Sequence, residues 1–336
     1  MKRRRFIAAS LGVCAIGAAP AGTRLLTGAT LAFGASVSIA AVHHDRAVAE
    51  RAIAAALCSV RAVDRLMSLH SPRSEVARIN RDGILRRPSR QLLTVLEEAC
   101  RLSRLTGGAF DITVQPLWQA FSRAAAAPGQ PRLPRERDRL DAARQVNWRH
   151  VEFDAAAVRL TRPGMAITLN GLAQGYAADL ALQALREHGI AAALLDTGEF
   201  VARGRRPARD GGEGRRPWNL GVRHPRDAGG LAAVVRLDDR AMATSGDYAS
   251  TFTPDRLHHH ILDPATGFSP VELASVTVMA PTGLQADGLS TACMVLGAAR
   301  AHALAARLPG VDLLTVDKHG VARRSPGFAA VELPPT

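Results

Sequence analysis

Apolar residues recur at helical spacing in the first third of the chain. Between Ala47 and Met67 one face carries Ile53, Leu57 and Val60, and this pattern predicts an amphipathic helix. A second helix is predicted after Ser89, whose hydroxyl can cap the first helical turn. The apolar side of this second helix consists of Leu92, Leu93, Leu96, Ala99 and Leu102. Gly107-Gly108 is expected to end it, because glycine readily adopts the left-handed conformation that follows helix C-termini.

Further along, apolar runs bounded by glycine predict strands and additional helices. We expect strands near residues 30–42, 190–195, 231–237, 275–280 and 311–316, with Gly34 inside the first. Helices are expected over about residues 171–189 and 298–308, and from near Leu284. Residues 122–139 and 203–217 are predicted to be loops. No linker separates two units, so the pattern favours one mixed α/β domain over about residues 30–331, with a mixed sheet and flanking helices.

Composition narrows the classes of partner. The chain has 336 residues, 47% hydrophobic and 22% charged, which is typical of a globular protein with a sizeable core. The net charge of +13 comes almost entirely from arginine, since Lys2 and Lys318 are the only lysines. The arginines are scattered along the chain, whereas nucleic-acid-binding proteins concentrate basic residues on one face. Composition therefore argues against a nucleic-acid partner and leaves a weak attraction to anionic membrane surfaces open.

The first 21 residues have the organisation of an export signal. Lys2-Arg3-Arg4-Arg5 is basic, residues 6–19 form a short apolar run, and Ala19-Pro20-Ala21 offers a small-x-small cleavage site. Arg3-Arg4-Arg5-Phe6 favours a twin-arginine signal over an ordinary secretory one. We therefore expect a periplasmic protein. Association with the inner membrane, and removal or lipidation of the leader, stay open.

Four cysteines are present, at positions 14, 58, 100 and 293, with neither a C-x-x-C pair nor zinc-ligand spacing. Cys58 and Cys100 fall on apolar helical faces, where free cysteines pack as small hydrophobic residues. We expect neither a disulfide framework nor a thiol nucleophile.

Two segments have both a structural and a ligand-binding interpretation. Asp287 and Thr291 are four residues apart on a predicted helix, so they share a face and could bind a hard cation such as Mg²⁺. Asp and Thr near a helix start are more often caps. The small residues from Gly171 to Gly175 would let a phosphate approach the N–H groups at the positive end of a helix dipole. Close packing of that helix on a strand explains the same glycines.

The consecutive histidines His258, His259 and His260 do not converge easily on one metal ion, because neighbouring side chains of a strand point to opposite faces. We expect one functional member and two incidental ones. The residues from Asp263 to Gly267 predict a tight turn. Gly107 to Thr113 reads either as a helix end followed by a strand, or as a ligand contact in which Phe110 backs a planar group and Asp111 accepts its hydrogen bonds.

The order of these segments resembles one family. The chain carries Gly-x-Phe-Asp-x-Thr at 108–113, Leu-x-Gly-x-Ala-x-Gly-Tyr at 169–176, Thr-Ser-Gly-Asp-Tyr at 244–248, His-Ile-x-Asp-Pro-x-Thr-Gly at 260–267 and Ala-Asp-x-x-x-Thr at 286–291. This series resembles the FAD:protein FMN transferase (ApbE) family from about residue 30 to the end, and Ser68 to Asn80 resembles an early segment of that family. The resemblance implies an enzyme that splits FAD, attaches FMN through a phosphodiester to a threonine of an acceptor protein, and releases AMP.

The resemblance also implies roles for individual residues. His260 stands at the position of the mechanistically important histidine. The implied ligands of Mg²⁺ are Asp287 and Thr291, with the backbone carbonyl of Gly171. The implied FAD-binding positions are Phe33, His70, Ala109, Phe110, Asp111, Thr168, Gln174, Thr244, Ser245, Gly246 and Ile261.

Several positions depart from the family pattern. Thr168 stands where an aspartate is usual, and Gln174 where a lysine is usual. Phe33, His70 and Ala265 replace a methionine, a tyrosine and an arginine, and Glu199-Phe200 interrupts a segment that commonly reads Gly-Gly-Asp. Two alternatives therefore stay open beside the transferase: a hydrolase that gives FMN and AMP on the same site, and a periplasmic flavin-binding protein without catalytic activity.

Overall fold

The computed structural model describes residues 23–127, 133–208 and 214–334. The expected leader, residues 1–21, lies outside the described residues. Within them, no helix is both long enough and apolar enough to cross a membrane.

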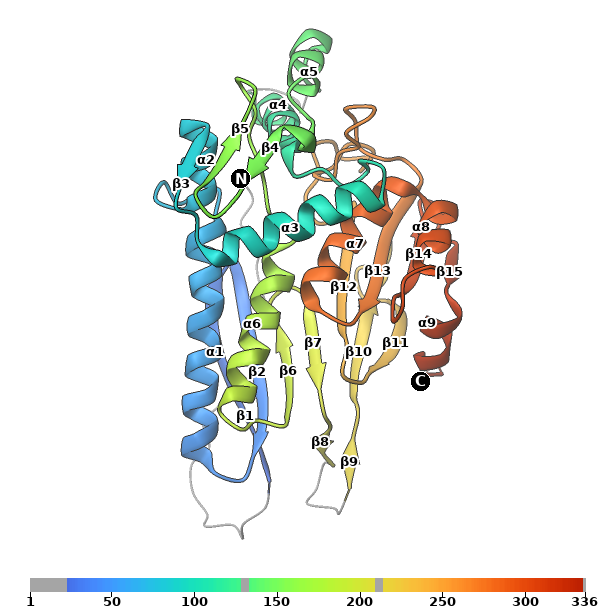
Figure 1. Ribbon diagram of the computed structural model, residues 1–336. Helices are drawn as coiled ribbons and strands as arrows, with labels where there is room; N and C mark the ends of the chain where they lie inside the picture. The colour runs from blue at the N-terminus through green and yellow to red at the C-terminus, as the bar shows by residue number, and fades with distance from the viewer. Residues whose placement is uncertain (1–22, 128–132, 209–213, 335–336) are drawn as a thin grey trace.

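An eight-stranded sheet forms the centre of the molecule, in the order β1-β2-β6-β7-β12-β13-β14-β15 (Figure 1). These strands are β1 (Arg24–Ala32), β2 (Ala35–His43), β6 (Ala192–Asp196), β7 (Phe200–Arg203), β12 (Ala241–Gly246), β13 (Leu273–Ala280), β14 (Asp312–Asp317) and β15 (Ala322–Arg324). The α/β class is confirmed, but all the pairings in this sheet are antiparallel, so the expectation of a mixed sheet is corrected.

Helices cover one face of this sheet. In Figure 1, α1 (Arg46–Met67), α6 (Ala173–Glu187) and α7 (Gly283–Leu296) lie across it, and α3 (Arg90–Leu105) crosses near their upper ends. The predicted apolar faces of α1 and α3 are buried in the main core, and the Ser89 hydroxyl accepts the Leu92 N–H as the predicted cap. The short α8 (Ala298–Ala305) follows α7.

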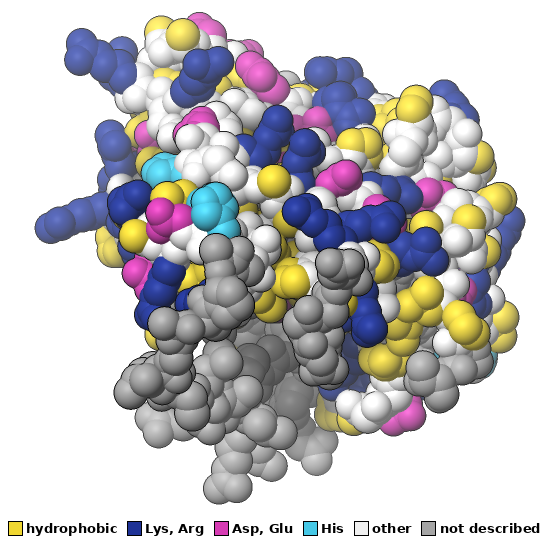
Figure 2. Space-filling view, turned by 90° about the horizontal axis from the view of Figure 1, so that it is seen from below, with side chains coloured by type: hydrophobic (Ala, Val, Ile, Leu, Met, Phe, Trp, Pro, Cys, Tyr) yellow, Lys and Arg dark blue, Asp and Glu magenta, His cyan; other side chains and the backbone are white. Residues whose placement is uncertain are grey.

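A smaller second core lies on the opposite face. The hairpin β10 (Trp218–Arg223) and β11 (Leu231–Leu237) packs there with α9 (Pro326–Val331), burying Trp218, Val235 and Phe328. The ribbon β8 (Arg206–Pro207) and β9 (Arg215–Arg216) extends from the lower end of the molecule (Figure 1). Seen from below, basic side chains are interspersed with acidic and apolar ones (Figure 2).

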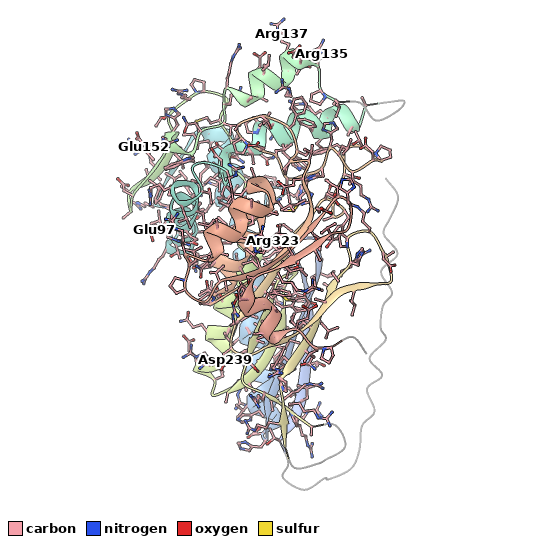
Figure 3. All side chains as sticks on the ribbon, turned by 90° about the vertical axis from the view of Figure 1, so that its right-hand side faces the viewer. Glu97, Arg135, Arg137, Glu152, Asp239 and Arg323 are labelled. Atoms are coloured by element: carbon pink, nitrogen blue, oxygen red, sulfur yellow. The ribbon has the colours of Figure 1, made fainter. Side chains whose placement is uncertain are left out.

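The upper end of the molecule carries the remaining elements. They are α2 (Glu75–Asp82), β3 (Ile84–Arg86), η1 (Ile112–Val114), α4 (Gln115–Ala125), α5 (Glu136–Ala143), η2 (Trp148–His150), β4 (Val151–Phe153) and β5 (Ala157–Leu160). A third apolar cluster includes Leu117, Phe121 and Phe252 and joins α4 to the segment after β12. Arg135, which directly precedes α5, and Arg137, which lies within it, project from this end (Figure 3).

Three sequence expectations are wrong in detail. The strand expected over 30–42 is a hairpin, because Phe33 and Gly34 both have positive φ, 54° and 72°, and form a two-residue turn. Residues 122–139 are not one loop: α4 continues through alanines to Ala125, and α5 begins at Glu136, whose charge suits a helix N-terminus. Cys58 is exposed because it lies beside the buried stripe of α1, whereas Cys100 and Cys293 are buried.

The closest backbone approach that bears on function is between α6 and α7. A Cβ added at Gly175 would collide with the Gly283 carbonyl oxygen and come within 2.8 Å of Asp287 Cβ, and a Cβ at Gly283 would collide with the Gly175 carbonyl. Asp179 of α6 accepts the Gly283 and Leu284 N–H groups of α7, at 2.7 and 2.9 Å. Asp287 of α7 in turn accepts the Gly175 N–H of α6 at 3.1 Å. The two helices therefore cap each other.

We expect Gly175→Ala to destabilise the protein by about 1–3 kcal/mol, because the added methyl group overpacks a backbone-to-backbone contact. In an open helix the same change would instead stabilise by about 0.5–1 kcal/mol. Urea unfolding shows whether the free energy of unfolding falls or rises in the variant. Gly229→Ala is the control, since the nearest atom to its added Cβ is 3.9 Å away, and it should change stability little. Equal stability of the two variants would refute the close crossing.

Candidate functional site

A cavity of about 260 Å³ lies where the N-terminal end of α6, the end of β12, α7 and the segment after His259 meet. All but two of the predicted site residues line it: Ala109, Phe110, Asp111, Thr168, Gly171, Gln174, Thr244, Ser245, Gly246, His260, Ile261, Asp287 and Thr291. Residues up to 182 positions apart in the sequence are thus brought to one place, from 109 to 291. The exceptions are Phe33, half-buried in the β1–β2 turn, and His70, exposed after α1.

Two carboxyl groups line this cavity, the buried Asp287 and the half-buried Glu199. Burial raises the pKa of Asp287 to about 7; the Gly175 N–H opposes this shift and the charge of Asp179 adds to it. Burial, followed by the charge of Asp287, raises the pKa of Glu199 well above its usual range, and the Thr244 N–H opposes that shift. Among the described residues, no basic side chain offsets either charge. A cation placed here would therefore relieve an electrostatic cost.

Hydroxyl oxygens line the cavity one helical turn along α7 from Asp287. Gly171 lies so close to Thr291 that a Cβ on Gly171 would sit 2.9 Å from Thr291 Oγ1. The Ser245 Oγ lies 2.7 Å from Ser290 Oγ and 3.3 Å from Thr291 Oγ1. Within the described ranges, no group of three or more His, Cys, Asp or Glu side chains is placed to hold a metal ion. Mg²⁺ needs fewer, because it commonly binds one or two carboxylates and completes its shell with phosphate and water. Asp287 with the oxygens of Gly171 and Thr291 fits that ion.

The N-terminus of α6 opens onto the same cavity. Leu172 occupies the cap position without a side-chain hydrogen bond to the first helical turn. Gly171, Gln174 and Asn170 around it line the cavity. Asp287 accepts one N–H of this first turn, that of Gly175. The partial positive charge at this end of the helix still suits an anionic group such as phosphate.

His260 is the member of the histidine run that lines the cavity. Its Nδ1 lies 3.1 Å from the Ser250 carbonyl oxygen. Because a carbonyl only accepts, Nδ1 carries the hydrogen, and Nε2 of the neutral ring keeps its lone pair. Burial lowers the pKa of His260, although Ser250 and Asp247 oppose the shift, so the ring favours the neutral form.

The other two histidines have structural surroundings. His258 packs against Phe121 and Phe268. His259 is fully buried; its N–H donates to Ser269 Oγ, and its Nε2 donates to the Pro270 carbonyl. Burial lowers the pKa of His259 to about 4, which keeps that ring neutral.

Asp111 already has three hydrogen bonds within the protein. It accepts the N–H and hydroxyl of Thr113 at 2.8 and 2.6 Å and the Trp148 N–H at 2.9 Å. Burial still raises the pKa of Asp111. Its carboxylate thus orders the chain at this edge of the cavity, beside Phe110.

Gln174 and Thr168, the uncharged residues at positions where the family usually has charged ones, also have hydrogen-bond partners within the protein. Gln174 Nε2 donates to the Thr197 carbonyl at 2.6 Å, and the Thr197 hydroxyl donates to the Gln174 carbonyl at 3.0 Å. The Thr168 hydroxyl accepts the Asn170 N–H at 3.3 Å. Gln174 therefore fixes the β6–β7 turn to α6, and Thr168 stabilises the chain leading to Gly171.

Sequence reasoning missed part of the cavity. Its other lining residues are Ile112, Val114, Gln115, Trp118, Asn170, Glu199, Ala249, Leu262 and Val295. In the sequence Glu199 interrupts a family motif, yet in the fold it places a second carboxyl group near Asp287. A carboxylate directly after Gly198, in a turn between two apolar strands, was the signal available.

Comparisons with known proteins agree with this geometry. The family model described as the ApbE family matches residues 33–315. A FAD:protein FMN transferase from Treponema pallidum is 36% identical over 250 residues, which span 71% of this chain and 69% of that protein. One from Vibrio cholerae is 32% identical over 251 residues, spanning 72% of each.

Solved structures extend the likeness to the fold. The ApbE protein from Thermotoga maritima matches with a TM-score of 0.81 at 29% identity, covering 92% of this chain and 100% of that one. The flavin transferase ApbE from Vibrio cholerae matches with a TM-score of 0.78 at 26% identity, with the same coverages. The chain therefore belongs to the ApbE family of enzymes, as the order of its motifs predicted.

Proposed function

We propose that this protein is a magnesium-dependent FAD:protein FMN transferase that attaches FMN to a threonine of an acceptor protein. The observation that carries the proposal is the meeting, in one cavity, of Asp287, Gly171 and Thr291, the N-terminal end of α6 and His260. The relatives named FAD:protein FMN transferase support the same assignment. The leader expected over residues 1–21 puts the reaction in the periplasm.

The diphosphate of FAD would lie in the cavity beside Gly171, Asp287 and Thr291. Asp287 with Gly171 and Thr291 would hold Mg²⁺, which when bound neutralises charge on the diphosphate as AMP leaves. The positive end of the α6 dipole would attract a phosphate oxygen, and the hydroxyls of Ser245 and Thr291 can donate to others. Ala109, Phe110 and Ile261 offer an apolar surface for the flavin ring. The FAD-binding roles proposed for Phe33 and His70 rest only on the resemblance to the family, because neither residue lines the cavity.

His260 would move the proton. The acceptor threonine gives its hydroxyl proton to Nε2 of His260, and its oxygen forms a bond to the FMN-side phosphorus. The phosphorus–oxygen bond to the AMP side breaks, so AMP leaves with the bridging oxygen. The Ser250 carbonyl keeps the ring in the tautomer that this step needs. Positioning of the reactants supplies much of the rate.

We expect the protein, incubated with FAD, Mg²⁺ and an acceptor protein bearing a reactive threonine, to release AMP in step with covalent flavin on the acceptor. Mass spectrometry of the acceptor and chromatography of the nucleotides measure both products. Free FMN with no covalent flavin would instead indicate the hydrolase. Bound but unchanged FAD would indicate a flavin-binding protein without activity.

Asp287→Asn should lower magnesium-dependent FAD cleavage by at least about 100-fold, because it keeps the size of the side chain and removes the charge that holds the cation. Asp179→Asn is a matched control: Asp179 caps α7 as Asp287 caps α6, but it does not line the cavity. Both variants should lose some thermal stability, and only Asp287→Asn should lose turnover and affinity for Mg²⁺. Normal turnover of Asp287→Asn at low Mg²⁺ would reject the metal site.

His260→Ala should lower kcat by roughly 10²–10⁴-fold while the KM for FAD changes little, since the ring acts on the incoming hydroxyl. His258→Ala serves as the control, because that ring packs between phenylalanines outside the cavity. It should retain near-normal kcat. Small and equal effects of the two changes would rule out the role of His260.

A further inference from the structure

A buried ionic cluster lies next to the cavity without lining it. Asp247 is fully buried and accepts a bidentate pair of hydrogen bonds from Arg226, at 2.8 and 2.7 Å. Lys318 Nζ donates to the same carboxylate at 2.6 Å. Burial by itself would raise the pKa of Asp247, but the hydrogen bonds from Arg226 and Lys318 outweigh it and lower the pKa. Asp247 is therefore held as an anion between two cations.

The cluster ties together segments that are distant in the sequence. Arg226 follows β10, Asp247 follows β12, and Lys318 lies in the turn after β14. Lys318 Nζ also donates to the Arg256 carbonyl at 3.2 Å. The side chains of Arg226 and Arg256 both donate to the Pro225 carbonyl, at 3.4 and 3.1 Å.

The chain between Asp247 and His260 forms a closed loop above this cluster. Its two arms are joined where His260 N–H donates to the Ser250 carbonyl at 3.1 Å and Phe252 N–H donates to the His258 carbonyl at 2.8 Å. Asp247 is at the base of the loop and Arg256 is near its tip, so Lys318 contacts both ends. The ring of His260 is oriented by Ser250, three residues after Asp247.

Stability alone is a weak reason for such a cluster. The desolvation free energy of a buried ion pair is about as large as the attraction between its charges, and a well-packed apolar cluster is often as stable. What a multiply bonded buried carboxylate does provide is a defined geometry. Removing one partner then leaves a buried charge uncompensated.

Lys318 is distinctive in this chain. It is one of two lysines among 43 basic residues, and it lies beyond residue 315, where the family match ends. An ammonium group is compact and has three donors, so it reaches a carboxylate and a carbonyl in different directions. A planar guanidinium is larger and suits two parallel bonds, which is how Arg226 binds Asp247.

We propose that Asp247, Arg226 and Lys318 form an ionic clamp that positions His260 at the cavity. All three are positioning residues, because none of them lines the cavity and they act through the loop from Asp247 to His260. The effect on turnover rests on the proposed function of His260, whereas the position of its ring is measurable without any turnover.

The first test compares Asp247→Asn with the double variant Asp247→Asn/Lys318→Met. Asparagine keeps the size of the side chain but leaves the positive charges of Arg226 and Lys318 facing each other without the carboxylate between them. We expect the single variant to lower kcat by about 10- to 100-fold with the KM for FAD nearly unchanged. The double variant removes one surplus charge and should recover part of kcat. Loss of both kcat and FAD affinity in step, without recovery in the double variant, would overturn the clamp.

The second test reads the His260 ring directly. Imidazole signals in NMR spectra of the full protein, with His260 assigned through His260→Gln, should shift in Asp247→Asn and return part of the way in the double variant. Absence of transfer by the wild-type protein would reject the proposed function and leave this test intact. Unchanged His260 signals in Asp247→Asn would reject the clamp whatever the activity.

Asp312→Asn is the matched control. Asp312 forms a comparable, partly buried ion pair with Arg240 at 2.9 Å, but neither residue contacts the loop from Asp247 to His260. It should lower the melting temperature and leave kcat and the His260 signals unchanged. If Asp312→Asn altered both as Asp247→Asn does, the effect would be general destabilisation, and the clamp would be refuted.

Discussion

The reciprocal capping of α6 and α7 is the interaction on which the site depends. The helices cross where Gly175 meets Gly283, with no side chain between their backbones, and Asp179 and Asp287 each accept N–H groups from the other helix. One carboxylate, Asp287, therefore stabilises the crossing and faces the cavity at once. Its place in the cavity is as rigid as the helix pair that carries it.

This arrangement has an electrostatic cost. Burial raises the pKa of Asp179 to about 6 and that of Asp287 to about 7. A raised pKa in the folded state means that the fold favours the protonated form, so this contribution to stability is present at low pH and is lost as the pH rises through about 6 to 7. Near neutral pH the neighbouring acids Asp287 and Glu199 therefore repel each other, and a divalent cation would relieve this repulsion.

Helices and loop contribute differently to the cavity. Asp287, Thr291 and Gly171 belong to the rigid helix crossing, whereas His260 closes a loop that returns from the end of β12. Precise geometry is harder to maintain on a loop than on a helix, and the buried ion cluster at Asp247 compensates for this difference. The neutral pair Thr168 and Gln174 is likewise satisfied by backbone partners, so two departures from the family pattern fit without an unpaired charge.

The sequence by itself determined the local elements and the membership of the family. Helical spacing located α1 and α3, the hydroxyl of Ser89 predicted a cap, and the resemblance to the family named more than half of the residues that line the cavity. The sequence did not predict the β1–β2 turn, because phenylalanine rarely adopts the positive φ that Phe33 has there. Only the tertiary structure decided three contacts of the site. It placed Glu199 beside Asp287, and it brought Asp287 to an N–H group 112 residues away in the sequence. It also brought Asp247 to Lys318, 71 residues away. Spacing along a chain specifies which side chains share a face, but the partner across that face is set by how whole elements pack.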